Sequence, residues 1–158
     1  MGYLEICSKK EKAANKLVIK PPRRLIQPAL VICCKDYRYI QATQRFVQRQ
    51  GVRWYDLKAT AGGLRALLDA PEVVRRWILK DVLLVHRLHG VKHIIIVQHQ
   101  DCAGYGGSSA FKDAAAERAF HQKQFRRAKK MLTRALSGVR VAGYFISGAP
   151  NRIRLTPM

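Results

Sequence analysis

Acidic residues are scarce in this chain of 158 residues: 10 Asp and Glu stand against 30 Lys and Arg, a formal net charge of +20. Long apolar runs are also missing, since none approaches the roughly 20 residues that a membrane-spanning helix needs. The polar N-terminus "MGYLEICSKKEKAANK" lacks the apolar stretch of a secretory signal, and Ile6 stands where a myristoylation motif requires Ser or Thr. We therefore expect a soluble, cytoplasmic protein with no membrane contact.

Cysteine is sparse as well, with four residues at Cys7, Cys33, Cys34 and Cys102. The adjacent pair Cys33 and Cys34 cannot easily form a bridge, which argues against a disulfide framework. Metal binding or burial explains these residues better. Because neighbouring side chains alternate along a strand, we expect Cys33 to lie in the core on the side opposite Cys34. Cys7 is expected to be incidental.

The excess of positive charge favours an anionic partner. Basic residues gather in "SKKEKAANKLVIKPPRRL" (8–25) and in "HQKQFRRAKKMLTRAL" (121–136), and either segment could contact phosphates with release of counterions. A solvated basic surface is the alternative, because no aromatic-interleaved or helix-turn-helix pattern accompanies the charge. The charge thus allows contact with a polyanion without naming a function.

The length and a hydrophobic content of 48% suffice for one domain with a real core. Residues 1–27 are predicted to form a basic N-terminal arm, and its prolines, Pro21 and Pro22, exclude a continuous helix. Residues 28–158 are predicted to form the single domain.

Strands and helices are expected to alternate within residues 28–158. Short apolar stretches predict strands at 29–34, 53–59, 93–99 and 139–146. Apolar residues at helical intervals predict helices at 40–51, 70–90 and 113–137. This order favours an α/β fold, a parallel sheet of about four strands in the order 2-1-3-4 with helices on both faces.

Metal-binding side chains follow two of the predicted strands. The first strand ends in "CCKDYR" (33–38) and the third in "HQDC" (99–102). In the order 2-1-3-4 these strands are neighbours, and their carboxyl ends meet at the switch point where ligands gather in such sheets. Cys34, His99 and Cys102 would supply two thiolates and one imidazole, a set suited to tetrahedral zinc. Asp36 would be a fourth ligand or a hydrogen-bonding partner of the site.

These two segments carry a resemblance to a known family. The residues "CKDYR" (34–38) and "HQDC" (99–102) resemble the Cys-x-Asp-x-Arg and His-x-x-Cys motifs of the β-class carbonic anhydrases, in what looks like a short branch of that family. The similarity covers about residues 28 to 146 and includes the loop "AGG" (61–63), which is similar to a turn of the family.

The resemblance implies a zinc lyase that converts CO2 and water to bicarbonate, reversibly, by means of zinc-bound hydroxide. It also implies that Cys34, His99 and Cys102 hold Zn²⁺. Asp36 then either occupies the fourth position or pairs with Arg38 and admits water, so that Asp36 and Arg38 form a gating pair. Members of this family associate as homodimers or larger homo-oligomers.

Some positions depart from the family pattern. Tyr37 stands where Ser is usual, Ala103 replaces a Gly, and Ala59-Thr60 replace Arg-Asn. Tyr37 and Ala103 are expected to narrow or reshape the CO2 pocket, which leaves a zinc hydrolase of CS2 or COS as an alternative. A second alternative is a non-catalytic, zinc-stabilised basic module that binds nucleic acid. The Asp36 and Arg38 pair favours an enzyme, because a structural zinc site does not need it.

Other polar and aromatic residues have simpler interpretations. His121 is expected on a helix surface, and Asp101 is expected to cap backbone amides of the loop beside it. Three histidines are expected to be structural or exposed: His86, His89 and His93. Three glycines are expected to form either a tight turn or an anion-binding loop: Gly104, Gly106 and Gly107. Four aromatic residues are candidates for a subunit interface: Trp54, Tyr55, Phe111 and Phe120.

Overall fold

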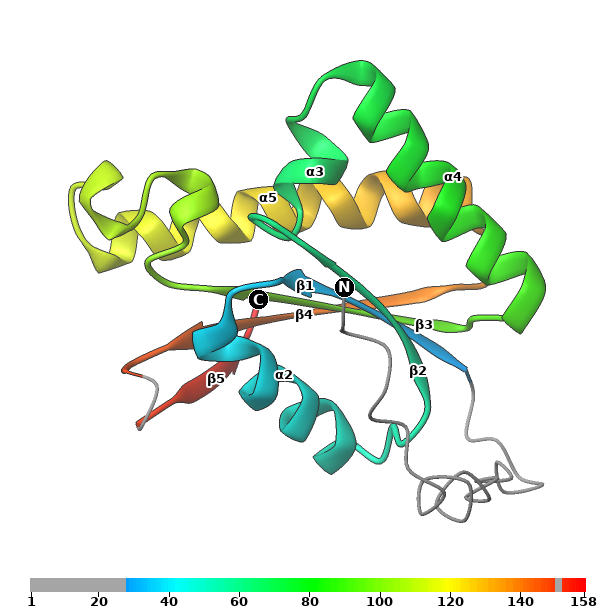
Figure 1. Ribbon diagram of the computed structural model, residues 1–158, viewed down its shortest axis with the longest axis horizontal. Coiled ribbons are helices and arrows are strands. Elements are labelled where there is room, and N and C mark those ends of the chain that lie inside the picture. Colours follow the sequence, from blue (N-terminus) through cyan, green and yellow to red (C-terminus); the bar gives the residue numbers. More distant parts are fainter. Residues whose placement is uncertain (1–27, 150–151) are drawn as a thin grey trace, which may run out of the picture.

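A five-stranded sheet separates two layers of helices in the computed structural model, which describes residues 28–149 and 152–158 (Figure 1). The strands lie in the order β2-β1-β3-β4-β5. The parallel strands are β1 (Ala29–Cys34), β2 (Tyr55–Thr60), β3 (His93–His99) and β4 (Arg140–Ser147). The predicted order 2-1-3-4 is confirmed. The edge strand β5 (Arg154–Pro157), antiparallel to β4, was not predicted.

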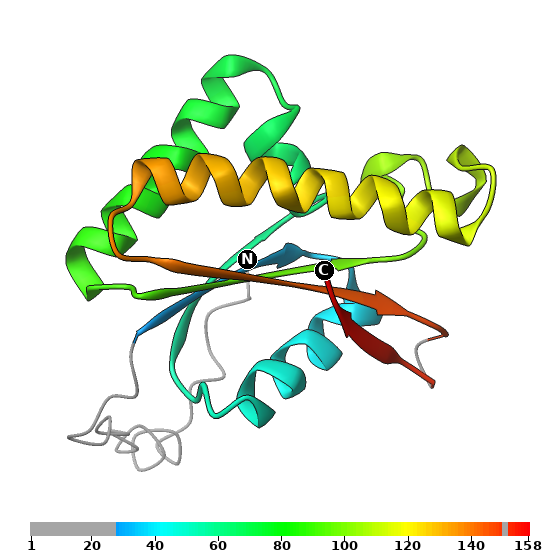
Figure 2. The same cartoon turned by 180° about the vertical axis from the view of Figure 1, so that it is seen from behind.

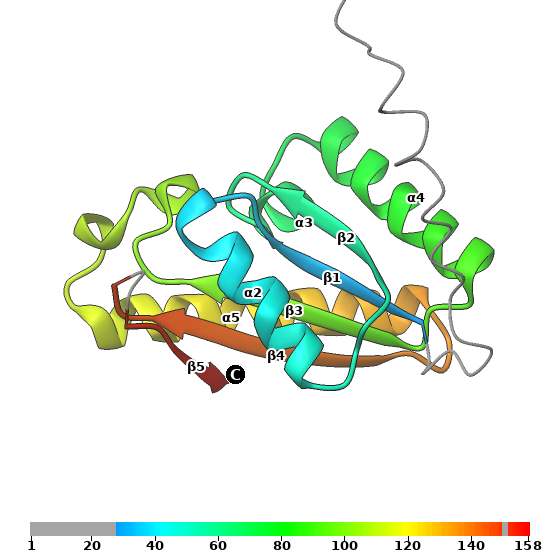
Figure 3. The same cartoon turned by 60° about the horizontal axis from the view of Figure 1, so that its bottom comes forward.

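Helices cover both faces of the sheet, as predicted. One face carries α2 (Tyr37–Arg49), and Figure 3 views the sheet from this side. The other face carries α3 (Arg65–Leu68), α4 (Glu72–His89) and α5 (Ala114–Ala135). The view from behind shows α5 lying lengthwise over the sheet (Figure 2). Two 3-10 turns, Ala103–Tyr105 and Ser108–Ala110, connect β3 to α5.

Local hydrogen bonds explain where the helices begin and end. The helix α2 begins three residues before the predicted start at 40, because the Asp36 carboxylate accepts a hydrogen bond from the backbone N–H of Arg38 and caps the helix. Asp113 caps α5 in the same way by accepting from the N–H of Ala116. The helix α4 ends where Gly90 adopts a left-handed conformation with φ of 63°. The predicted helix at 70–90 therefore holds to within two residues.

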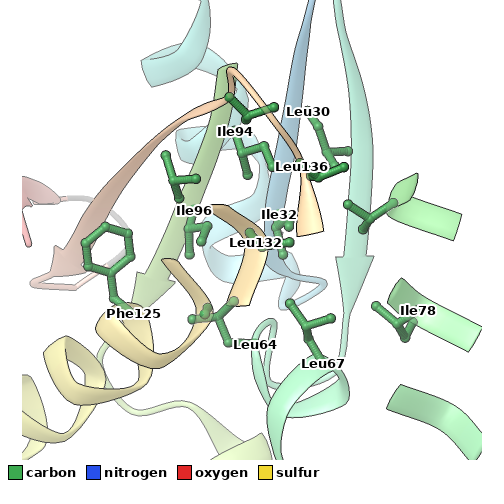
Figure 4. Close-up of a cluster of buried hydrophobic side chains, with 14 of the residues drawn as sticks. Leu30, Ile32, Leu64, Leu67, Ile78, Ile94, Ile96, Phe125, Leu132 and Leu136 are labelled. Atoms are coloured by element: carbon green, nitrogen blue, oxygen red, sulfur yellow. The ribbon is translucent and has the colours of Figure 1, made fainter. Parts of the chain in front are cut away.

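Two apolar cores form because side chains alternate along the strands. Leu30 and Ile32 of β1 point into the larger core beneath α3, α4 and α5, where they meet Leu132 (Figure 4). Val31 and Cys33 point to the opposite face and pack beneath α2. The prediction that Cys33 lies in the core is confirmed. Cys34, the next residue, marks the end of the strand at the edge where the loops begin.

The predicted N-terminal arm, residues 1–27, lies outside the described residues, and Cys7 with it, so this domain boundary remains a prediction. Among the helices that the structure describes, none has the length and apolar character that crossing a bilayer requires.

Candidate metal centre

Cys34, His99 and Cys102 come together at one edge of the sheet. Cys34 is the last residue of β1, His99 is the last residue of β3, and these strands are parallel neighbours. The ligand atoms of the three residues all lie within 4.8 Å of one another. The predicted meeting of these side chains at the carboxyl ends of the first and third strands is confirmed. Parallel pairing is the cause, because it brings both strand ends to the same edge.

The His99 ring is oriented as a metal ligand would be. Its Nδ1 lies 2.7 Å from the carbonyl oxygen of Gln100, which can only accept, so Nδ1 carries the proton. The lone pair is then on Nε2, which is buried and has no hydrogen-bond partner within the described part of the chain. Since a buried polar atom normally has a partner, this nitrogen fits a metal ion as its missing contact.

The two thiols form a hydrogen-bonded pair. The Cys102 thiol donates to the sulfur of Cys34 over 4.0 Å. This hydrogen bond lowers the pKa of Cys34 below its ordinary value, and the backbone N–H groups of Asp36 and Gly62 act in the same direction. The same hydrogen bond and burial raise the pKa of Cys102 well above its ordinary value. The paired sulfurs thus favour one thiolate, to which a divalent cation would be attracted.

Arg38 holds the carboxylate of Asp36 with a bidentate contact. The Nε atom of Arg38 lies 3.0 Å from Oδ1 and its NH2 nitrogen lies 2.8 Å from Oδ2 of Asp36. These bonds keep the pKa of Asp36 below its usual value, so the group is ionised. The cluster of ligand atoms consists of the two thiols and the imidazole, and Asp36 is paired beside it.

The same guanidinium group also binds the loop that follows β3. The NH1 nitrogen of Arg38 lies 2.8 Å from Oδ2 of Asp101, and NH2 lies 2.9 Å from the carbonyl oxygen of Asp101. The other carboxylate oxygen of Asp101 accepts from the N–H of Ser108 at 3.1 Å, which confirms the predicted cap of a loop amide. The contact with Arg38 was not predicted.

Comparison with known proteins agrees with this geometry. A family model described as "Putative carbonic anhydrase" matches residues 27–153. The chain belongs to this carbonic anhydrase family. None of the curated proteins with which the sequence was compared matches it.

Two solved structures are similar to this chain in their fold. A β-carbonic anhydrase, isoform I of the protozoan Trichomonas vaginalis, is similar with a TM-score of 0.55 and 15% identity, over 99% of this chain and 97% of that one. A tetrameric β-carbonic anhydrase of the fungus Sordaria macrospora is similar with a TM-score of 0.49 and 18% identity, over 84% of this chain and 82% of that one. At these identities, the similarity to the Trichomonas vaginalis structure shows that this chain has the same fold, and it shows nothing about activity or substrate.

The prediction for His121 is wrong, since this side chain is only 1% exposed. Its Nδ1 lies 2.9 Å from Oε1 of Gln98, whose Nε2 donates to the carbonyl oxygen of His121. Burial lowers the pKa of His121 to about 4. The buried side of α5 includes three polar residues, so an apolar pattern did not reveal that His121 belongs to it. Its buried residues are Glu117, His121, Gln124, Phe125, Ala128 and Leu132.

Sequence reasoning missed Glu117. This residue is 2% exposed, and its carboxylate accepts hydrogen bonds from the backbone N–H of Asp101 at 2.6 Å and from the Ser108 hydroxyl at 2.8 Å. A Glu in the first turn of a helix normally faces solvent and interacts with the helix dipole, so its type and position gave no signal. Only the packing of α5 against the loop brings Glu117 to the metal centre.

Tyr37 and Ala103 both lie at the surface of the chain. The Tyr37 side chain is 85% exposed at the start of α2, and Ala103 is also exposed, so their expected effect on a CO2 pocket remains a prediction. Beside the cysteines, two loops approach each other closely. A Cβ atom on Gly104 would lie 2.5 Å from Cα of Gly62, a distance that real Cβ atoms do not show. Of the two predictions for the glycine loop, the tight turn is confirmed.

Most of the aromatic residues predicted for a subunit interface pack against other residues of the same chain. The rings of Phe111 and Phe120 pack on each other with centroids 5.2 Å apart, and Tyr55 is half-buried. Trp54 is exposed as expected. The three histidines outside the centre and α5 are placed as predicted, half-buried or exposed: His86, His89 and His93.

Proposed function

We propose that the protein is a zinc-dependent, carbonic anhydrase-like enzyme that catalyses the reversible hydration of CO2 to bicarbonate. The observation that carries this proposal is one arrangement: two thiols and an imidazole with ligand atoms within 4.8 Å, beside a carboxylate held by an arginine. A site built only to stabilise the fold has no need of the Asp36 and Arg38 pair. Membership of the carbonic anhydrase family supports the same proposal.

The side chains present fit a zinc ion. Two sulfur donors and one nitrogen donor are ligands that zinc takes in tetrahedral sites, and a catalytic site uses three protein ligands. Cys34, His99 and Cys102 would hold the ion, and the lone pair of His99 Nε2 has no other described partner. Bound zinc would supply Lewis-acid chemistry, which lowers the pKa of water from 15.7 to about 7.

Asp36 and Arg38 would orient the water that reacts with CO2. Arg38 keeps Asp36 ionised and fixes its direction, because the bidentate contact uses both carboxylate oxygens. Each oxygen of a carboxylate can accept more than one hydrogen bond. Asp36 can therefore accept a hydrogen bond from the water that attacks CO2 and orient it, while remaining off the metal.

The test is stopped-flow CO2 hydration by zinc-loaded protein at about pH 7 and about pH 8.5, for the wild type and Asp36→Asn. We expect hydration by the wild type, stronger at the higher pH, and a large loss in the variant. Asp81→Asn is the matched control, since Asp81 pairs with Lys58 away from the centre. Absence of hydration at both pH values with zinc in place would reject the proposal. CS2 and COS assayed on the same samples would then decide whether a zinc hydrolase takes its place.

A second candidate function is binding to nucleic acid through the basic surface. In the described ranges, the eight acidic residues all have a local hydrogen-bond or ion-pair partner: Asp36, Asp56, Asp69, Glu72, Asp81, Asp101, Asp113 and Glu117. Five exposed basic residues on α5 form no ion pair with these acidic residues: Lys123, Arg126, Lys129, Lys130 and Arg134. The outer side of α5 is therefore a surface that phosphates would favour.

Its test is the affinity for a duplex DNA of arbitrary sequence at several salt concentrations. If α5 is the surface, the affinity should fall steeply with salt, and Lys123→Ala/Arg126→Ala/Lys130→Ala should flatten the slope by about 0.9 for each lost phosphate contact. Arg45→Ala/Arg49→Ala/Arg53→Ala, on and just after α2, removes the same number of charges and is the control for net charge. Weak binding that does not depend on salt would dismiss this candidate.

We also propose that a second copy of the chain covers one side of α4. Val73, Trp77, Leu84 and Leu88 are exposed and lie on one face of this helix, since they follow at intervals of four and seven residues. The exposed Trp54 and the sheet-edge residue Leu57 continue this apolar surface toward β2. Light scattering during size-exclusion chromatography should give the molar mass of a homodimer or larger oligomer for the wild type. The variant Trp77→Glu/Leu88→Glu should give the mass of a monomer. A monomeric wild type would contradict the proposal.

A further inference from the structure

Asp101 adopts a backbone conformation that needs outside support. Its φ of 53° lies in the left-handed region, and within the described residues it is the only non-glycine with a positive φ. All four of its polar groups are engaged. The backbone N–H bonds to Glu117, the carbonyl oxygen and Oδ2 accept from Arg38, and Oδ1 accepts from Ser108. Asp101 therefore joins α5 to the guanidinium group that holds Asp36.

Glu117 is the buried end of this chain of contacts. Its two oxygens accept from the Asp101 N–H at 2.6 Å and from the Ser108 hydroxyl at 2.8 Å. Both donors belong to the loop that carries Cys102, and no Lys or Arg in the described part of the chain forms an ion pair with Glu117. A buried carboxyl group without a cationic partner is costly, so packing alone gives no reason for Glu at this position.

We infer that Glu117 is a positioning residue for the metal centre: through the backbone of Asp101 it fixes Arg38, and Arg38 in turn holds Asp36 away from the three ligands. The inference rests on the proposed CO2 hydration for its catalytic meaning. Its structural content is independent of the substrate, because it concerns which group the Asp36 carboxylate binds.

Removal of the Glu117 carboxyl group should release this arrangement stepwise. The Asp101 N–H loses its acceptor, and the left-handed conformation loses the bond that opposes its relaxation. Arg38 then loses the Asp101 carbonyl and carboxylate as fixed acceptors, while its bonds to Asp36 remain. Arg38 is then no longer fixed in position, so Asp36 becomes able to move to the metal as a fourth ligand. Groups that orient ligands in this way change metal affinity or activity by about 10- to 100-fold.

The experiment compares Glu117→Ala with Glu117→Gln, with Glu72→Ala as the control for loss of an exposed glutamate in the first turn of a helix. Zinc affinity is measured by competition with a chelator, and the ligand set by the visible absorption of the Co²⁺-loaded protein. The pH profile of CO2 hydration is the third readout. Glu117→Ala should bind zinc more tightly, because Asp36 can add a fourth ligand, should alter the Co²⁺ spectrum, and should lose about tenfold or more in activity at neutral pH, with activity shifted to higher pH.

The conservative variant separates positioning from packing. The amide oxygen of Glu117→Gln can still accept from Asp101, and its NH2 group can donate to Ser108, so its spectrum and pH profile should stay close to the wild type. Should Glu117→Ala fail to fold, Ser108→Ala removes one of the two bonds and should change the same readouts in the same direction. A folded Glu117→Ala with unchanged affinity, spectrum and pH profile would overturn the inference. A changed spectrum in a protein without hydration activity would support it and reject the proposed function instead.

Discussion

The sulfur atoms of Cys34 and Cys102 lie 4.0 Å apart, although 68 positions separate the two residues in the chain. The distance is far longer than a disulfide bond, and the three cysteines of the described residues are unbridged. The pair has one thiol that donates and one sulfur whose pKa is lowered below its ordinary value. Two sulfurs held in this way, with His99 beside them, form a site prepared for a cation.

Substitution of any one of the three clustered residues should therefore abolish tight zinc binding. Cys34→Ala and His99→Ala should lose tightly bound zinc, because each removes one of three donors. Cys33→Ala is the matched control, since this neighbouring cysteine faces the core beneath α2 and should leave one zinc per chain. Elemental analysis of the purified proteins measures this. Full zinc occupancy in Cys34→Ala would show that the metal lies elsewhere.

Replacement of Arg38 by lysine should disrupt the centre without a change of charge. The guanidinium group reaches Asp36 and Asp101 at once through three nitrogens, and a single ammonium group cannot reproduce this geometry. We expect Arg38→Lys to retain the fold and to lose about 10- to 100-fold in CO2 hydration at neutral pH. Stopped-flow assays with circular dichroism as the folding check give the answer, and a fully active Arg38→Lys would contradict the assigned role.

His121 should make the stability of the protein fall in acid. Its pKa is lowered to about 4 in the folded state, against about 6.5 in an unfolded chain, so the unfolded state binds an additional proton between these values. The contribution of neutral His121 to the free energy of unfolding is fully present above about pH 6.5. It is lost as the pH falls toward 4, by on the order of 3 kcal/mol. Urea unfolding at several pH values should show this slope, and His121→Gln should remove much of it. An equal slope in the variant would assign the acid sensitivity to other groups.

A methyl group at Gly104 should push two loops apart. Its Cβ would lie 2.5 Å from Cα of Gly62 and 2.7 Å from the Gly62 nitrogen, and backbone atoms cannot move aside as a flexible side chain does. Gly104→Ala should be destabilised by about 1 to 3 kcal/mol and should bind zinc less tightly, since Gly62 also bonds to Cys34. Urea unfolding measures this stability, and a Gly104→Ala protein as stable as the wild type would contradict the expectation.

Local pattern in the sequence was sufficient for the four parallel strands and for the meeting of the three candidate ligands, but not for the edge strand β5. The stretch 93–99 is apolar and bounded by polar residues, and it forms β3 over the predicted residues. Once alternating strands and helices imply parallel strands, residues that directly follow β1 and β3 must share one edge. Cys34, His99 and Cys102 could be placed together for this reason, without knowledge of any distance.

Tertiary structure alone decided what surrounds these ligands. Glu117 and His121 are polar residues on the inner side of α5, and their burial depends on how this helix is rotated against the loop and sheet. The inner side of α5 is polar at these two positions, so apolar periodicity did not reveal their burial. The contact of Arg38 with Asp101 likewise joins residues 63 positions apart and depends on one left-handed peptide unit. The local sequence thus determined which candidate ligands meet at the sheet edge, and the packing of α5 determined which buried polar groups lie beside them.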